Sequence, residues 1–98
     1  MTSATTTELA IQAINTRETM SFNYDNKPRH VEVHAIGVGG KGEIMRAWQL
    51  SPEPTWRLFS VEKIEAPQLS LLTPSQAPRP GYNLHDSAMI TIHAQVQP

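Results

Sequence analysis

The sequence contains no cysteine among its 98 residues, which excludes disulfide bonds, thiolate nucleophiles and cysteine-ligated zinc. It also has no excess of either charge, since eight Lys and Arg stand against nine Asp and Glu for a formal net charge of -1. A chain with so little net charge has no long-range field that attracts nucleic acid or an anionic membrane. Any such binding must therefore come from a local patch.

Long hydrophobic runs are missing as well. No apolar segment approaches the roughly 20 residues that span a bilayer, and the Thr-rich and Ser-rich N-terminus has neither the basic start nor the apolar segment of a signal peptide. We therefore expect an unexported, cytoplasmic protein with no membrane contact. A length of 98 residues with 39% hydrophobic residues suits one small globular domain and is too short for a multidomain enzyme.

The spacing of apolar residues predicts one helix followed by several strands. Residues 1–7 are polar and expected to be flexible, while Thr5 and Glu8 have the spacing of a capping box and precede an apolar stripe at helical period. Alternating apolar and polar residues then predict four strands, at residues 20–24, 29–37, 43–50 and 56–65. A short edge pairing is expected at residues 69–72.

The C-terminal part of the chain is harder to interpret. Residues 73–81 contain three prolines, which predicts an arm that wraps the surface. Residues 86–97 match the period of a strand and also that of a helix capped by Asp86, and we favour the helix. Residues 8–72 are thus expected to form the domain, and residues 73–98 to pack on it.

This order of elements predicts a mostly β protein with an N-terminal helix. Several short antiparallel strands must close on themselves or be covered, because an open sheet of this size exposes its edges. A small SH3-like or Sm-like β-barrel is the most economical solution.

Four blocks of residues occur in a distinctive order. They are Phe22-Asn23-Tyr24, Arg29 to Gly37, Gly42 with Met45 to Gln49, and Trp56 to Ile64, the last containing Arg57, Phe59, Glu62 and Lys63. The segment from Arg79 to Asn83 follows, as in the tail of a compact subgroup. Over about residues 8–96 this order resembles the WYL domain family, a ligand-sensing module usually attached to bacterial transcription factors.

The chain also departs from that family. The tripeptide that names the family is absent, with Ile44-Met45-Arg46 in its place, and Val33 stands where the family usually has proline. Only one helix precedes the first expected strand, so no helix-turn-helix and no self-contained transcription factor is expected. The resemblance implies a small Sm-like or SH3-like barrel that binds nucleic acid or nucleotide-like ligands through basic and aromatic residues.

The candidate binding residues are cations and aromatic side chains. Arg46, Arg57 and Lys63 are expected to hold phosphate groups, for which a guanidinium fork and an ammonium are well suited. Four aromatic residues are candidates for stacking bases: Tyr24, Trp48, Trp56 and Tyr82. The alternatives are that the cations pair with Glu53, Glu62 or Glu65 on the surface, and that the rings belong to the core.

Other chemistries find weaker support. His30 and His34 flank Glu32 on the expected polar face of one strand, a spacing that suits a metal pair, yet we expect neither metal nor cofactor. The glycines of residues 37–42 lack the following helix of a phosphate loop and predict a hairpin turn. Glu32 and Glu62 would need a cleft to act as a catalytic pair, and no nucleophile stands beside a base, so we expect no enzyme.

The sequence therefore predicts a non-enzymatic ligand-sensing or regulatory protein that binds single-stranded DNA or RNA, or a nucleotide. The alternative is a protein-interaction module, in which a barrel edge or the Pro-rich arm docks on a larger protein or forms a homodimer or weak oligomer. Salt distinguishes the two, because phosphate binding weakens steeply with ionic strength and an apolar interface does not.

Overall fold

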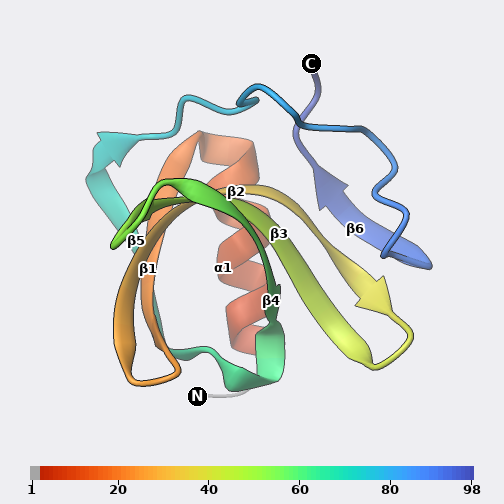
Figure 1. Ribbon diagram of the computed structural model, residues 1–98, viewed down its shortest axis with the longest axis horizontal. Coiled ribbons are helices and arrows are strands. Elements are labelled where there is room, and N and C mark those ends of the chain that lie inside the picture. The colour runs from red at the N-terminus through yellow and green to blue at the C-terminus, as the bar shows by residue number, and fades with distance from the viewer. Residues whose placement is uncertain (1–2) are drawn as a thin grey trace.

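The computed structural model describes residues 3–98, which form one helix and a six-stranded antiparallel sheet (Figure 1). The elements are α1 (Ser3–Thr16), β1 (Glu18–Tyr24), β2 (Lys27–Gly39), β3 (Gly42–Ser51), β4 (Thr55–Ser60), the short 3-10 helix η1 (Val61–Lys63), β5 (Glu65–Pro74) and β6 (Thr91–Gln95). The strand order is β4-β3-β2-β1-β5, and β6 pairs with β2. The mostly β class with an N-terminal helix is confirmed.

Helix α1 begins earlier than expected. It starts at Ser3, so Thr5 and Glu8 lie within the helix and not at its cap, and residues 1–2 of the expected flexible segment lie outside the described residues. The helix ends where Arg17 adopts a left-handed backbone with a φ of 59°. The N–H of Ser75 donates to the carbonyl of Arg17 at 2.8 Å, which ties the end of the helix to the end of β5.

The sheet is not closed into a barrel, because β4 and β5 lie at its two ends and do not pair with each other. The expectation of a closed barrel is therefore wrong. Helix α1 lies on the concave side of the curved sheet instead (Figure 1). Its buried Ala10 and Ala13 pack with Met20, Phe59 and Val33 in one core cluster. Covering the concave face with a helix removes the apolar side chains from water, as closure would have done.

The fourth strand is shorter than predicted and the fifth is longer. Strand β4 ends at Ser60, so Lys63 lies in η1 and not on a strand. Strand β5 continues through Pro67. The register between β1 and β5 shifts at this point, between the pairs of Ser21 and Asn23, and such an irregularity accommodates a residue that donates no ladder hydrogen bond.

The predicted C-terminal helix is wrong, since Thr91–Gln95 forms β6. Strand β1 pairs with β2 only up to Val31, which leaves the edge of β2 beyond it open, and β6 pairs there with Ala35–Val38. Gly37 allows this approach, because a Cβ at that position would lie 2.2 Å from the carbonyl oxygen of Thr91. The free edge of β2, far away in the sequence, thus decides that Thr91–Gln95 forms a strand, which the local periodicity had left open.

Strand β2 is buried on both faces. Every residue from 31 to 37 is buried, and its inward side chains belong to the core under α1. The opposite face carries Glu32 and His34, which are 1% and 0% exposed. The expectation that these two residues lie on a solvated polar face is wrong, because the segment after β5 covers them.

That covering segment, residues 75–90, is held to β2 by buried polar contacts; we call it the arm. The Nε of Arg79 lies 2.6 Å from Oε1 of Glu32, and the N–H of Gln76 donates to Oε2 at 2.6 Å. The N–H of Arg79 donates to Nε2 of His34 at 3.0 Å. A carboxylate buried so deeply is stable only while these donors surround it, so the arm and the sheet depend on each other.

Removing the guanidinium of Arg79 would leave the Glu32 carboxylate buried without its ion-pair partner. We expect Arg79→Ala to lower the free energy of unfolding by about 3 kcal/mol, since deleting one member of a buried pair costs about 3–5 kcal/mol and Arg79 is itself partly exposed. Urea denaturation followed by circular dichroism measures the change. Lys41→Ala, in the exposed β2–β3 turn, is the control and should change stability by less than about 0.5 kcal/mol. Equal stability of the two variants would contradict this account.

Candidate functional site

Three polar side chains occupy strand positions that face the core side of the sheet. Arg29, Gln49 and Arg57 each lie directly opposite a core residue of a neighbouring strand, namely Phe22, Val31 and Ala47 respectively. Directly paired residues project from the same face of a sheet. The core face is therefore polar at this end, where apolar residues would be expected.

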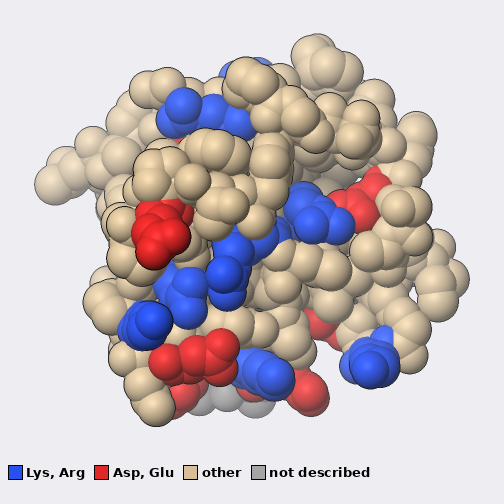
Figure 2. All heavy atoms as spheres, viewed as in Figure 1, with Lys and Arg blue, Asp and Glu red and all other residues tan. Residues whose placement is uncertain are grey.

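These three residues line a cavity of about 300 Å³ together with Lys27 and the exposed Asp25 and Glu53. We call it the cationic cavity. In the described part of the chain, no carboxylate lies within ion-pair distance of its three cations, Lys27, Arg29 and Arg57. Figure 2 shows Lys and Arg side chains gathered in a band across one face of the molecule. A local positive patch thus exists in a chain without net positive charge.

Arg29 is the most unusual member of this cavity. It is 7% exposed, and its guanidinium donates through Nη1 to Oε1 of Gln49 at 2.8 Å and through Nη2 to the carbonyl of Tyr24 at 3.3 Å. The guanidinium carbon lies 5.7 Å from the centroid of the Tyr24 ring. Its Nε is buried and has no hydrogen-bond partner among the described residues. Arg29 is therefore a desolvated cation that no carboxylate of residues 3–98 neutralises.

Arg29 was missed by sequence reasoning, although a signal was present. It is separated by two and by four residues from Val31 and Val33 along β2, so its side chain lies on the same inward face as these two apolar residues. Gln49 stands in the same relation to Met45 and Ala47. A charged or amide side chain in the inward phase of an otherwise apolar strand is the pattern that would have identified this cavity.

The predicted binding residues divide between the two faces of the sheet. Arg46, Trp48 and Trp56 lie on the outer face, away from α1, because they alternate with the inward residues of β3 and β4. Trp48 and Trp56 are paired, with ring centroids 5.5 Å apart in an edge-to-face arrangement. Arg57 projects from the inner face, where its guanidinium carbon lies 5.8 Å from the Phe59 ring centroid.

The remaining two predicted residues lie elsewhere. Tyr24 is 8% exposed, and its ring packs edge-on against Phe22 and Phe59, so it belongs to the core as the alternative reading proposed. Lys63 lies in η1 and does not line the cationic cavity. The structure thus brings Arg46 and Trp56 together and leaves Arg57 and Lys63 apart from them.

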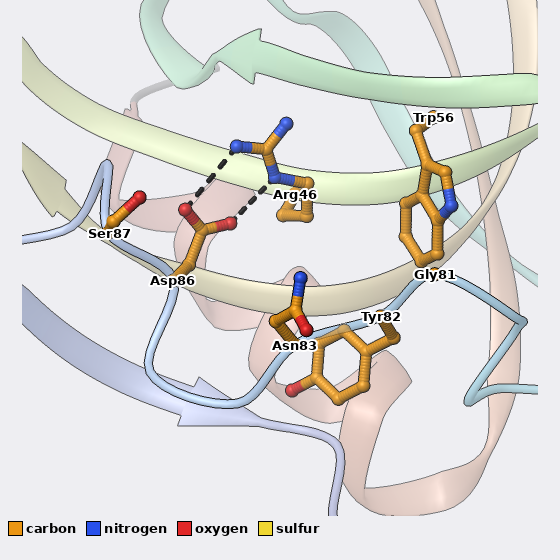
Figure 3. A pocket seen from close by; sticks show the side chains of 7 residues that line it. All are labelled: Arg46, Trp56, Gly81, Tyr82, Asn83, Asp86 and Ser87. Carbon is orange, nitrogen blue, oxygen red and sulfur yellow. Dashed lines mark hydrogen bonds and ion pairs between the residues drawn. The ribbon is translucent and has the colours of Figure 1, made fainter.

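A second cavity, of about 260 Å³, lies on the outer face under the arm, and we call it the outer cavity (Figure 3). It is lined by Arg46, Trp56, Gly81, Tyr82, Asn83, Asp86 and Ser87. Tyr82, which the sequence had suggested as a stacking residue, therefore lies beside Trp56.

The carboxylate partner of Arg46 comes from the arm, 40 residues along the chain. The Nε of Arg46 lies 2.6 Å from Oδ2 of Asp86, and Nη2 lies 3.3 Å from Oδ1. Hydrogen bonding from Arg46 lowers the pKa of Asp86 below its ordinary value, so this carboxylate stays ionised and the pair stays formed. The pair fixes the arm against β3.

His34 lies beneath the outer cavity and is held in one tautomer. Its Nδ1 lies 2.9 Å from the carbonyl of Glu32 and must donate, while its Nε2 accepts the N–H of Arg79. Burial lowers the pKa of His34, an effect that the neighbouring Glu32 charge only partly offsets. The ring is therefore neutral and supports Trp56 and Tyr82, at centroid distances of 4.7 and 5.1 Å.

The suggested metal pair of His30 and His34 is not supported by this geometry. His30 contacts the hydroxyl of Thr19 through Nε2 at 2.7 Å, and both ring nitrogens of His34 are engaged with backbone groups. Within residues 3–98, no three His, Cys, Asp or Glu side chains are arranged to hold a metal ion. None of the helices in this range is long and apolar enough to span a membrane.

Comparison with protein families, with curated proteins and with solved structures finds no match to this chain.

We expect the free energy of unfolding to fall as the pH is lowered from about 7 to about 5, in part through His34. The folded protein depresses the pKa of this imidazole below 6.5, so the unfolded chain binds the proton more readily. The stability it contributes is thus complete above that value and is lost as the pH falls through the folded pKa.

The pKa of the His34 imidazole can be measured by NMR, and urea denaturation across the same pH range measures the coupling. His34→Gln should reduce the pH dependence of unfolding, whereas His85→Gln, at an exposed position of the arm, should leave the contribution of His34 in place. An imidazole of His34 that titrates at or above the ordinary value would show this account to be wrong.

Proposed function

We propose that this protein binds a phosphate-bearing ligand, single-stranded nucleic acid or a nucleotide, in the cationic cavity. It acts as a WYL-like ligand-sensing or regulatory protein of the cytoplasm, and not as an enzyme. The observation that carries the proposal is Arg29, a buried guanidinium that has neither a carboxylate partner nor a hydrogen-bond partner for its Nε within the described part of the chain.

An anion in the cavity would compensate this charge. Burying a cation is costly unless an opposite charge or several hydrogen bonds replace the lost water, and Arg29 keeps only two donated bonds to neutral oxygens. Lys27 and Arg57 line the same cavity and have no ion-pair partner among residues 3–98. Three cations therefore converge on one volume, and they outnumber the two carboxylates of Asp25 and Glu53.

Phosphate is the anion that these groups suit best. A guanidinium offers parallel N–H donors that match two phosphate oxygens, and an ammonium adds a flexible point charge. A cavity of about 300 Å³ has room for a phosphate group but not for a long strand, so a larger ligand must extend beyond it. The lining residues supply positive charge and hydrogen-bond donors and no nucleophile paired with a base, which favours binding over catalysis.

The strand connectivity supports the WYL-like part of the proposal. Strands β1 to β4 follow one another as neighbours, and β5 returns to pair with β1. An SH3-like or Sm-like fold, which the resemblance implies, would have this order of strands, although the sheet here is open between β4 and β5. Arg57 belongs to the sequence block that resembles the family most, and it lines the cationic cavity.

A protein-interaction module is the second candidate, and one observation favours it. Strand β5 is an edge of the sheet that carries Leu71 and Leu72, which are 76% and 96% exposed. Unpaired strand edges readily accept a strand from another chain. A second copy of this protein could add its own β5 there and form a homodimer.

Fluorescence anisotropy with labelled oligothymidylate and oligouridylate, at low and moderate salt, tests the proposal. We expect salt-sensitive binding that Arg57→Ala weakens about tenfold, because a hydrogen bond to a charged group is worth about 1.5–3 kcal/mol. The slope of log affinity against log salt should also become shallower by about 0.7 when one phosphate contact is lost.

Lys63→Ala is the matched control, since it removes one exposed cation that lies outside the cavity. Its effect should stay within about twofold, as for a distant and screened charge. Equal weakening by the two variants would indicate diffuse electrostatic attraction and contradict the assigned site. Absence of binding at every salt concentration, with light scattering at the mass of a dimer, would favour the interaction module.

A further inference from the structure

The outer cavity is bounded by flat rings on one side and by an ion pair on the other. Figure 3 shows Trp56 and Tyr82 opposite the Arg46–Asp86 pair, with Asn83 between them. The two rings are nearly parallel, with an interplanar angle of 22° and centroids 6.4 Å apart. Parallel aromatic faces bordering a cavity are suited to stacking a flat ring.

The rings are held in place by their polar atoms. The Nε1 of Trp56 donates to the carbonyl of Pro80 at 3.1 Å, and the hydroxyl of Tyr82 donates to the carbonyl of Val96 at 2.9 Å. Because these tips are already bonded within the protein and His34 packs against both rings, the parts of the rings that border the cavity are what remain for a ligand. The arrangement is preorganised, so binding need not order these side chains.

The arm is built to pass closely beside the indole of Trp56. Gly81 has a φ of +94°, and a Cβ there would lie 2.9 Å from the Nε1 of Trp56. A residue with a side chain would be strained at this backbone conformation and would also push the arm away from the ring. Gly81 thus allows the arm to form one wall of the cavity.

Two exposed polar side chains of the cavity have no hydrogen-bond partner among the described residues. Neither the amide of Asn83 nor the hydroxyl of Ser87 makes a hydrogen bond to another of residues 3–98. Both line the cavity beside the ion pair, so donors and acceptors surround the place that a stacked ring would occupy. Nucleobases combine a flat face with donors and acceptors along the edge, which matches both features.

We propose that the outer cavity binds a nucleobase of the same ligand whose phosphate occupies the cationic cavity; this inference rests on the proposed function. Trp56 and Arg57 are neighbours on β4, an edge strand, and their side chains point to opposite faces. A single strand that crosses this edge places a phosphate on the inner face and a base on the outer face. The Asn83 amide and the Ser87 hydroxyl contact the edge of the base.

The test compares two labelled oligonucleotides of equal length and charge, oligothymidylate and the same backbone with abasic tetrahydrofuran sites. Both carry the phosphates that the cationic cavity recognises, but only the first carries bases. We expect the base-containing strand to bind at least about fivefold more tightly, the size of one stacking contact. Trp56→Leu should abolish this ratio, and Asn83→Ala, at an exposed position that leaves the core intact, should reduce it.

The outcomes separate the two proposals. Salt-sensitive binding of both strands with equal affinity would refute the base site and leave the phosphate site standing. Binding of neither strand would refute the proposed function. A ratio that persists in Trp56→Leu and in Asn83→Ala would place the base elsewhere and overturn this inference.

Discussion

The buried carboxylate of Glu32 is the interaction on which the arrangement of the outer face depends. With 1% of its surface exposed, it requires the guanidinium of Arg79 and the N–H of Gln76 close by, and both come from the arm. Once the arm is held there, it brings Tyr82 beside Trp56 and Asp86 beside Arg46. A single charge on the middle strand thus organises a cavity from residues far apart in the sequence.

The arginines on the two faces of the sheet differ in whether a carboxylate neutralises them. On the outer face, Arg79 and Arg46 each have a carboxylate at 2.6 Å, so their charges are neutralised and serve the structure. On the inner face, Arg29 is more deeply buried than either and has no carboxylate within ion-pair distance among the described residues. A fold that pairs Glu32 and Asp86 with arginines and leaves the more deeply buried Arg29 without a carboxylate partner among the described residues is what the proposed anionic ligand would explain.

The sequence predicted the strands that form because of the pattern of their own residues. The period-two alternation around Phe22, Val33 and Ala47 placed the first three strands, but β6 forms only because β2 has a free edge, which no local pattern shows. Arg46 and Trp56 were predicted and do share a cavity. Arg57 lies on the inner face of the sheet, because the face on which a strand residue lies depends on how the strands pair. Lys63 was predicted to lie on the fourth strand, but that strand ends at Ser60.

The most direct test of the central claim is to observe Arg29 itself while a ligand binds. Its Nε–H is buried, so its resonance in a ¹H–¹⁵N NMR spectrum should be resolved, and Arg29→Lys assigns it. On titration with a short oligothymidylate, the account predicts that this resonance shifts saturably, while that of Arg79, already paired with Glu32, stays in place. An Arg29 resonance that is unchanged at saturating ligand would contradict the account.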